Sequence, residues 1–347
     1  MGDRSGLTVA ITGPTGDIGR ALVAALESTP EVERVIGMAR SPVIPAEQGW
    51  TKTEYLQGDI LDRAAVDVLV KGADVVVHLA FLIFGSPDET RAINIEGSRN
   101  VFEAAFQSRA DRLVYASSVA AYGFRDDNPE LLTEDVSTRG SEKHYYSQQK
   151  ADVEKLLDET ARGADTYTYM FRPCVVAGPT ALSLIERIPY VRISEKLPNT
   201  LKKIAGALPL LRPVIPDPGS PFQLVHEDDV ASALVAAILG QGPPGTYNLA
   251  AEGEVTLADL AHALGWYAVP VPELAMDATV KIVSRLPLLP AEAAWVNALQ
   301  VPVLMDCSKA RAKLGWTPRH DALDTLAQTI QGAREKGLLV WRDKLAE

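Results

Sequence analysis

The chain has 347 residues, 47% of them hydrophobic, which suffices for one large or two ordinary globular domains. Its 34 basic and 45 acidic residues give a net charge of −11 without any dense basic cluster, which disfavours nucleic acid as a partner. The chain begins without a signal-peptide pattern and has no apolar stretch that could span a bilayer. The two cysteines, Cys174 and Cys307, give neither a disulfide framework nor a metal signature. We therefore expect a cytoplasmic protein that contacts no membrane and carries no metal.

The first predicted element is a strand at residues 7–12, an apolar run with β-branched residues. A glycine turn follows at once and leads into a helix predicted for residues 17–28, an order typical of a dinucleotide site. In such a turn the first glycine permits the tight bend, the second lets backbone approach a pyrophosphate, and the third lets helix pack on strand. The helix N-terminus attracts the phosphates. The candidate cofactor contacts here are Gly13, Thr15, Gly16, Asp17, Ile18 and Gly19.

Strands and helices alternate through the first half of the chain. Strands are predicted near 7–12, 33–38, 53–57, 74–79, 112–117 and 166–172, and helices near 17–28, 62–70, 88–108 and 145–162. This alternation predicts an α/β fold with a doubly wound parallel sheet of Rossmann type.

Prolines interrupt the pattern between residues 181 and 220, and two further strands, 222–225 and 246–249, are predicted to return to the sheet. We therefore expect a dinucleotide-binding domain over residues 1–175 with a return segment at 221–250. A smaller, discontinuous substrate lobe would comprise residues 176–220 and 251–335.

Tyr146 and Lys150 lie four residues apart in the helix predicted for 145–162, so both side chains point to the same side. A nearby ammonium favours phenolate, and we expect Lys150 to lower the pKa of Tyr146. A tyrosine tuned in this way exchanges a proton with a carbonyl or an alcohol near neutral pH. Tyr145 is the rival acid, but its neighbour four residues on, Gln149, is uncharged.

Taken together, these motifs resemble those of the extended short-chain dehydrogenase/reductase family, of the NAD(P)-dependent epimerase/dehydratase type. Besides the glycine turn and the Tyr146/Lys150 pair, the matching segments are Asp59-Ile60, His78-Leu79-Ala80, Asn94 to Asn100, Tyr115 to Gly123, Arg172-Pro173, Gly178-Pro179, His226 to Val230 and Leu314 to Pro318. The resemblance implies that Asp59 contacts adenine and that Ile60, Leu79 and Ala80 also line the cofactor site. Asp59 has an alternative role, because it could instead cap the helix that follows it.

The resemblance also implies the catalytic set Ser118, Tyr146 and Lys150. Tyr146 would be the general acid in reduction and the base in oxidation, and Lys150 would hydrogen-bond the nicotinamide ribose. Ser118 would stabilise charge on the reacting oxygen. We choose it over Ser117 because the family serine precedes a Tyr-Gly tyrosine, here Tyr122, by four positions.

The choice of cofactor depends on the end of the second strand. Enzymes that use NAD usually place an acid there for the ribose hydroxyl, whereas this chain has Ala39 followed by Arg40. A guanidinium suits a 2′-phosphate, so the sequence favours NADP, with NAD as the alternative.

The substrate is the least constrained part of the interpretation. Val119 and Ala120 replace the acid pair of the family's dehydratases, and residues 221–225 lack the charged pair usual in its sugar-nucleotide epimerases. Apolar residues of the lobe suggest an apolar pocket, unless they only form core: Leu184, Ile185, Ile188, Leu208, Leu210 and Leu211. Three interpretations remain open: an oxidoreductase for an apolar small-molecule carbonyl compound or alcohol, a sugar-nucleotide epimerase, and a non-catalytic cofactor-sensing module.

We also expect a homodimer built on the helices near 88–108 and 145–162, which members of this family commonly pair into a four-helix bundle. The apolar positions of the first helix are Ile93, Val101, Ala104, Ala105 and Phe106. A helix fully buried within one subunit would show the same pattern.

Overall fold

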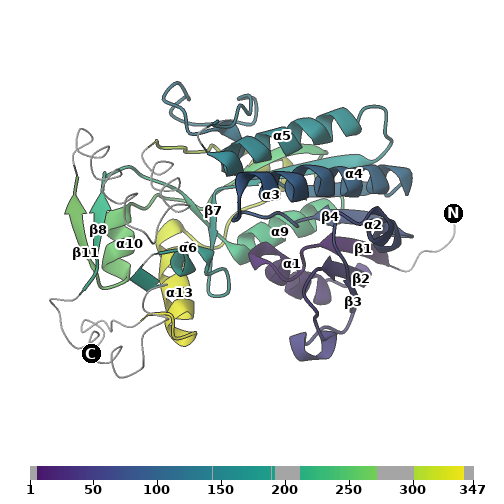
Figure 1. Cartoon of the computed structure of the whole chain (residues 1–347), viewed down its shortest axis with the longest axis horizontal. Helices are drawn as coiled ribbons and strands as arrows, with labels where there is room; N and C mark the ends of the chain where they lie inside the picture. Colours follow the sequence, from purple (N-terminus) through teal and green to yellow (C-terminus); the bar gives the residue numbers. More distant parts are fainter. Residues whose placement is uncertain (1–5, 143, 189, 192–211, 272–300, 340–347) are drawn as a thin grey trace.

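The computed structural model describes residues 6–142, 144–188, 190–191, 212–271 and 301–339 (Figure 1). Its main feature is a parallel sheet with the strand order β10-β6-β5-β4-β1-β2-β3. The strands are β1 (Leu7–Thr12), β2 (Val32–Ala39), β3 (Thr53–Gln57), β4 (Val75–His78), β5 (Arg112–Ala116), β6 (Tyr167–Pro173) and β10 (Gly245–Leu249). The chain reverses its direction of winding between β1 and β4, and ligands of such sheets bind at this switch point. The predicted doubly wound fold is confirmed.

Helices cover both faces of the sheet, which explains why the β4 sequence Val-Val-Val-His is buried along its whole length. On one face α1 (Asp17–Glu27) packs against α9 (Glu227–Ile238). On the other face lie α2 (Arg63–Val70), α4 (Gly97–Gln107) and α5 (Tyr145–Thr160), with α4 and α5 side by side (Figure 1). Side chains of β1 alternate between the two cores, since Val9 and Ile11 join the first and Ala10 the second.

The helix predicted for 88–108 is interrupted. It consists of α3 (Pro87–Arg91), a π-helical turn (Ala92–Glu96) and α4. Within the turn, the buried Asn94 side chain accepts a hydrogen bond from the Leu82 amide (2.7 Å) and donates to Leu82 O (2.9 Å) and Gln149 Oε1 (2.7 Å). The π turn therefore ties the loop after β4 to α5, as such turns often do beside functional sites.

A smaller lobe lies beyond the carboxyl end of β6 (Figure 1). It contains the paired strands β7 (Val175–Ala177) with β9 (Leu224–His226) and β8 (Val214–Asp217) with β11 (Tyr267–Pro270), and the helices α6 (Ser183–Glu186), α10 (Leu257–Ala263) and α13 (Ala322–Glu335). Short 3₁₀ turns at Pro45–Gln48 and Val119–Tyr122 and a π turn at Ala310–Leu314 complete the described elements. No helix among the described residues is long and apolar enough to cross a membrane.

One predicted strand has a different partner. Residues 222–225 were expected to return to the main sheet, but Leu224–His226 pairs with β7 in a separate two-stranded sheet, and only β10 joins the main one. The expectation is wrong because β7 follows β6 directly and offers β9 a free edge outside the sheet. The lobe has its own core, which includes Leu184, Ile185 and Ile188. Leu208, Leu210 and Leu211 lie outside the described residues.

Candidate active site

The glycine turn after β1 has the geometry that a dinucleotide phosphate needs. Gly13 has a φ of 76°, and a Cβ there would meet the Ala80 amide nitrogen at 2.9 Å. A Cβ on Gly19 would lie 2.1 Å from Gly13 O, so this glycine permits helix α1 to approach the turn. Gly16 differs, because its Cβ would meet nothing nearer than 3.6 Å. Gly16 is also the N-cap of α1, and no side chain caps this end of the helix. The backbone N–H groups of the first helical turn are therefore available to a pyrophosphate.

The other residues of the turn connect it to the substrate lobe. The Asp17 carboxylate pairs with Arg20 at 2.9 Å and accepts a hydrogen bond from Ser183 Oγ at 2.5 Å. Arg20 also donates to the carbonyls of Thr15 (2.6 Å) and Thr180 (3.0 Å). Ile18 is partly buried and packs on the core between α1 and the sheet. The turn is therefore held from both sides, by its own helix and by the start of the lobe.

At the predicted adenine end, Asp59 does not cap the next helix. Its carboxylate accepts the Leu61 amide at 3.0 Å, whereas Asp62 caps α2 by accepting from the Ala64 and Ala65 amides. Ile60 is buried, and a Cβ on Gly97 would clash with it at 2.4 Å. The capping alternative for Asp59 is thus wrong, and its place beside the ends of β2 and β3 agrees with a cofactor contact.

Leu79, Ala80 and Arg40 lie around the same edge of the sheet. Leu79 donates its amide to Thr12 O at 3.1 Å, and Ala80 lies against Gly13. The backbone oxygen of Arg40 accepts from Gln57 Nε2 at 3.0 Å. Within the described part of the chain, the exposed Arg40 side chain makes no hydrogen bond or ion pair, so its guanidinium is available to a ligand.

Ser118, Tyr146 and Lys150 come together where β5 ends and α5 begins. Ser118 starts the 3₁₀ turn by accepting from the Ala120 amide at 3.2 Å, and its hydroxyl also hydrogen-bonds Tyr146. Lys150 Nζ donates to Ala116 O at 2.9 Å and lies 3.8 Å from the centre of the Phe81 ring. Tyr146 and Lys150 are 9% and 3% exposed, so the three polar groups form one nearly dry cluster.

The predicted lowering of the Tyr146 pKa is wrong. Burial raises the pKa of the Tyr146 phenol above its ordinary value, and the hydrogen bond with Ser118 opposes that change only in part. Burial lowers the pKa of Lys150 from 10.5 to about 7, against the attraction of the Glu154 carboxylate. Desolvation is therefore the largest cause of both shifts, and the phenol keeps its proton at neutral pH.

A buried polar network lies directly beneath this cluster. Ser117 Oγ donates to Glu154 Oε1 at 2.5 Å, and Arg172 donates to both Glu154 carboxylate oxygens at 3.0 and 2.8 Å. Arg172 also donates to the Tyr122 hydroxyl at 2.8 Å, and that hydroxyl donates to Asn248 Oδ1 at 2.7 Å. Sequence reasoning missed this network, although Glu154 follows Lys150 by four residues and so lies on the same helical face.

The neighbouring serines thus have separate partners. Ser118 bonds the phenol of Tyr146, while Ser117 bonds the carboxylate of Glu154. This division supports the choice of Ser118 as the serine that faces a substrate.

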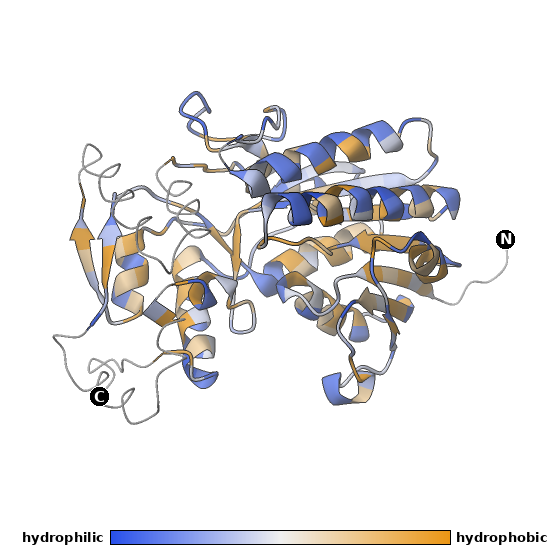
Figure 2. Cartoon of the chain, in the orientation of Figure 1, coloured by the Kyte–Doolittle hydropathy of each residue, from blue (hydrophilic) through white to orange (hydrophobic). Residues whose placement is uncertain are grey.

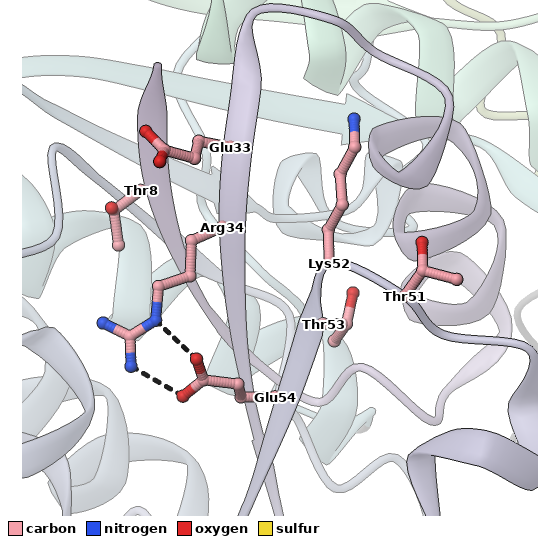
Figure 3. Close-up of a pocket in the computed structure, with 7 residues that line it drawn as sticks. All are labelled: Thr8, Glu33, Arg34, Thr51, Lys52, Thr53 and Glu54. Atoms are coloured by element: carbon pink, nitrogen blue, oxygen red, sulfur yellow. Dashed lines mark hydrogen bonds and ion pairs between the residues drawn. The ribbon is translucent and has the colours of Figure 1, made fainter. Parts of the chain in front are cut away.

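The depression drawn in Figure 3 lies at the other end of the sheet. It is lined by Thr8, Glu33, Arg34, Thr51, Lys52, Thr53 and Glu54, all at or just before the amino ends of β1, β2 and β3. Arg34 and Glu54 form a bidentate pair across it at 2.8 and 2.6 Å (Figure 3). Because the glycine turn and Ser118 follow the carboxyl ends of strands, this depression is not the candidate active site.

Known proteins match both the sequence and the fold. The model of the NAD dependent epimerase/dehydratase family matches residues 9–250. An uncharacterized protein of Mycobacterium tuberculosis is 25% identical over 335 residues, which cover 93% of this chain and 83% of the relative. A ceramide reductase of Caulobacter vibrioides is 31% identical over 229 residues, covering 66% of this chain and 60% of the relative.

Solved structures share the architecture. The UDP-glucose 4-epimerase of Thermotoga maritima with UDP-glucose has a TM-score of 0.71 at 20% identity, covering 95% of this chain and 99% of that one. A short-chain dehydrogenase/reductase superfamily protein from Agrobacterium tumefaciens with bound NAD has a TM-score of 0.70 at 21% identity, with 95% and 98% covered. At such identities the likeness shows the fold alone, but the family match spans the glycine turn, Ser118, Tyr146 and Lys150. This chain belongs to the NAD dependent epimerase/dehydratase family of extended short-chain dehydrogenases/reductases.

Proposed function

We propose that the protein is an NAD(P)-dependent oxidoreductase that interconverts a carbonyl and an alcohol on a fairly apolar small molecule. The observation that carries this proposal is the dry cluster of Ser118, Tyr146 and Lys150, at the edge of the sheet where the glycine turn also lies. A non-catalytic module would have no need of all three groups.

The protonation states suit reduction at neutral pH. The phenol of Tyr146 retains its proton and donates it to the carbonyl oxygen as the alcohol forms. Ser118, already bonded to that phenol, lies where it can donate to the same oxygen and stabilise its developing charge. Lys150, when protonated, stabilises the phenolate left behind. The nicotinamide cofactor, when bound, supplies or accepts the hydride.

Aromatic and small apolar groups near the cluster support an apolar substrate. The Phe81 ring packs edge-on against Tyr146 with centroids 5.6 Å apart. Val119 and Ala120, next to Ser118, offer no acid or base for dehydration. The relative named a ceramide reductase is consistent with the reduction of a lipid-like carbonyl compound.

A sugar-nucleotide epimerase is the second candidate, and Arg187 is the residue that favours it. Its guanidinium stacks on the Phe84 ring, 3.4 Å from the ring centre, and its charge acts on the neighbouring Tyr145. A cation beside Tyr145 would suit the diphosphate of a sugar nucleotide, such as the UDP-glucose bound to the Thermotoga maritima enzyme.

For the cofactor we propose a preference for NADP. The end of β2 has Ala39 where NAD enzymes usually have an acidic residue for the ribose hydroxyl, and the Arg40 that follows could bind a 2′-phosphate.

The decisive variant is Tyr146→Phe, which removes the acidic proton and leaves the ring. We expect turnover to fall about 10²–10⁴-fold with NADPH affinity within about twofold of the native value. Tyr145→Phe is the matched control, because its hydroxyl bonds the backbone of the loop after β4, donating to Ile83 O at 3.0 Å, and it should keep most activity. Native turnover in Tyr146→Phe with any accepted substrate would refute the assignment.

The cofactor balance separates the two candidates. An oxidoreductase consumes reduced cofactor in proportion to substrate, which the nicotinamide absorbance follows, whereas an epimerase converts its substrate with no net change in cofactor. The substrates to compare are long-chain ketones and UDP-sugars. Conversion of a UDP-sugar without cofactor consumption would favour the epimerase.

A further inference from the structure

We propose that His226, Asp228 and His320 form a binding site for a divalent transition metal ion of the Zn²⁺ type. His226 is the last residue of β9 and precedes α9, and His320 lies just before α13. One ligand atom from each of the three side chains lies within 4.8 Å of the other two. Two imidazoles and one carboxylate are a ligand set that suits Zn²⁺, Fe²⁺ or Ni²⁺ and does not suit Ca²⁺ or Mg²⁺.

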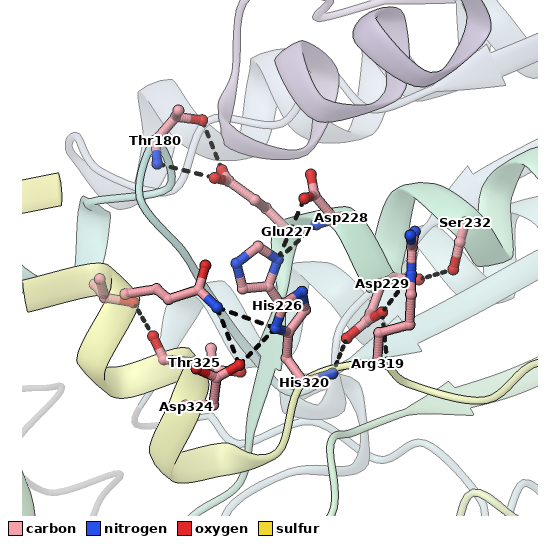
Figure 4. Close-up of polar contacts among 12 residues, drawn as sticks. Thr180, His226, Glu227, Asp228, Asp229, Ser232, Arg319, His320, Asp324 and Thr325 are labelled. Atoms are coloured by element: carbon pink, nitrogen blue, oxygen red, sulfur yellow. Dashed lines mark hydrogen bonds and ion pairs between the residues drawn. The ribbon is translucent and has the colours of Figure 1, made fainter. Parts of the chain in front are cut away.

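The two imidazole rings lie close together, with centroids 4.1 Å apart and ring planes tilted by 30° (Figure 4). His226 Nδ1 lies 3.8 Å from Asp228 Oδ2. Ligands of a tetrahedral zinc site are about 3.3 Å apart, because each bond is about 2.0–2.1 Å long. Because the three ligand atoms lie within 4.8 Å of one another, a contraction of at most about 1.5 Å would bring them around one ion.

Hydrogen bonds set both rings in tautomers that can bind a metal. His320 Nδ1 lies 2.6 Å from Asp324 Oδ2 and 3.1 Å from Gln328 Nε2. Because a carboxylate only accepts, the shorter contact favours the proton on Nδ1, which leaves the lone pair of Nε2 for a metal. Gln328 braces the same carboxylate from 3.0 Å. A carboxylate behind a histidine is the usual second partner of a metal-binding imidazole. His226 Nδ1 accepts the Asp228 amide at 3.1 Å, so it too has a lone pair, which the metal would take over from that amide.

His226 shows a second sign of an incomplete environment. The side chain is 1% exposed, and its Nε2 has no hydrogen-bond partner among the described residues. Histidines buried in this way usually have both nitrogens satisfied. The proposal places the metal at Nδ1, so Nε2 keeps its proton and is not itself a ligand.

The acidic neighbours hold the site in place and are not ligands themselves. Glu227 accepts from Thr180 through its amide (2.9 Å) and hydroxyl (2.7 Å). The fully buried Asp229 accepts from the backbone amides of Arg319 (2.9 Å) and His320 (3.1 Å), which fixes the segment before α13 against α9 (Figure 4). A metal would join the same two segments through side chains. No sequence motif marks this site, because His226 and His320 are far apart in the chain.

The test uses the full-length protein after treatment with a chelator, titrated with Zn²⁺ by calorimetry and with Co²⁺ by visible absorbance. We expect one ion per chain and a higher Tm with Zn²⁺. Asp228→Asn and His320→Gln alter exposed or half-buried groups, and each should lower the affinity at least tenfold. Asp324→Asn should lower it about 10–100-fold through loss of the second partner.

His262→Gln is the matched control, because this histidine is exposed on α10 and is not one of the three ligands. It should bind Zn²⁺ and Co²⁺ as the native protein does. The proposal is overturned if the native protein binds neither ion, or if Asp228→Asn and His320→Gln both bind with native affinity, since the ion would then lie elsewhere.

Discussion

Lys150 and Arg172 are both buried cations within reach of one carboxylate, Glu154, yet their environments differ. Arg172 donates two hydrogen bonds to Glu154 and one to Tyr122, and its pKa is raised. Lys150 has a carbonyl and an aromatic ring as neighbours, and burial lowers its pKa to about 7. A buried charge is stable only where hydrogen-bonded partners replace water. The network beneath the site therefore stabilises the fold, while the cluster above it holds a lysine that releases its proton readily.

The variant Arg172→Met tests how much the buried pair stabilises the fold. It leaves Glu154 buried without its cation, and we expect the free energy of unfolding to fall by about 3–5 kcal/mol. Chemical denaturation measures the loss. The control is Arg34→Met, which removes an equally bidentate but exposed pair with Glu54 and should cost less than about 1 kcal/mol. Equal losses in the two variants would show that burial does not separate them.

The second prediction concerns the sign of the Lys150 contribution. The unfolded chain keeps the Lys150 proton up to about pH 10.5 and the folded protein only up to about pH 7, so the unfolded state binds more protons in between. The free energy of unfolding should therefore rise with pH in this window, by about 1.4 kcal/mol per pH unit relative to Lys150→Met. Denaturation of both proteins at pH 7, 8 and 9 measures the difference. Parallel pH curves would contradict the lowered pKa.

The sequence predicts the parts of this site that depend on local pattern. The strand and helix around the glycine turn follow from periodicity, and the Tyr146/Lys150 spacing places both groups on one helical face. The Tyr146 pKa could not be predicted, because burial is set by packing against Phe81 and β5. The Glu154–Arg172 pair joins a helix to a strand that the residue types alone do not connect.

The same limit explains the strand at 222–225. Its residues have the pattern of a strand, and Leu224–His226 is one. The choice of β7 as partner is a long-range property that depends on where β6 ends. Local pattern therefore predicts the elements, and tertiary packing decides their partners and the charges they bury.

Arg40 is a third cation, and the partner that we propose for it is the 2′-phosphate of the cofactor. If it binds the 2′-phosphate, Arg40→Ala should weaken NADPH binding by about tenfold or more and leave NADH binding unchanged, because a hydrogen bond to a charged group contributes about 1.5–3 kcal/mol. Fluorescence titration with each cofactor measures both affinities. Equal native affinities, or a preference for NADPH that survives the substitution, would show that Arg40 does not select the cofactor.

A weaker interaction is expected on the outer side of α5, which carries Lys150, and of its neighbour α4. Val101, Ala104 and Ala105 of α4 are buried in the subunit's own core, and Ile93 and Phe106 pack partly on it. The faces of α4 and α5 turned to the viewer in Figure 2 are largely hydrophilic. Few apolar groups therefore remain for the homodimer that we predict on these helices, and its interface should be largely polar. Light scattering at micromolar concentration should give about twice the chain mass, and a value near 37.4 kDa would contradict the dimer.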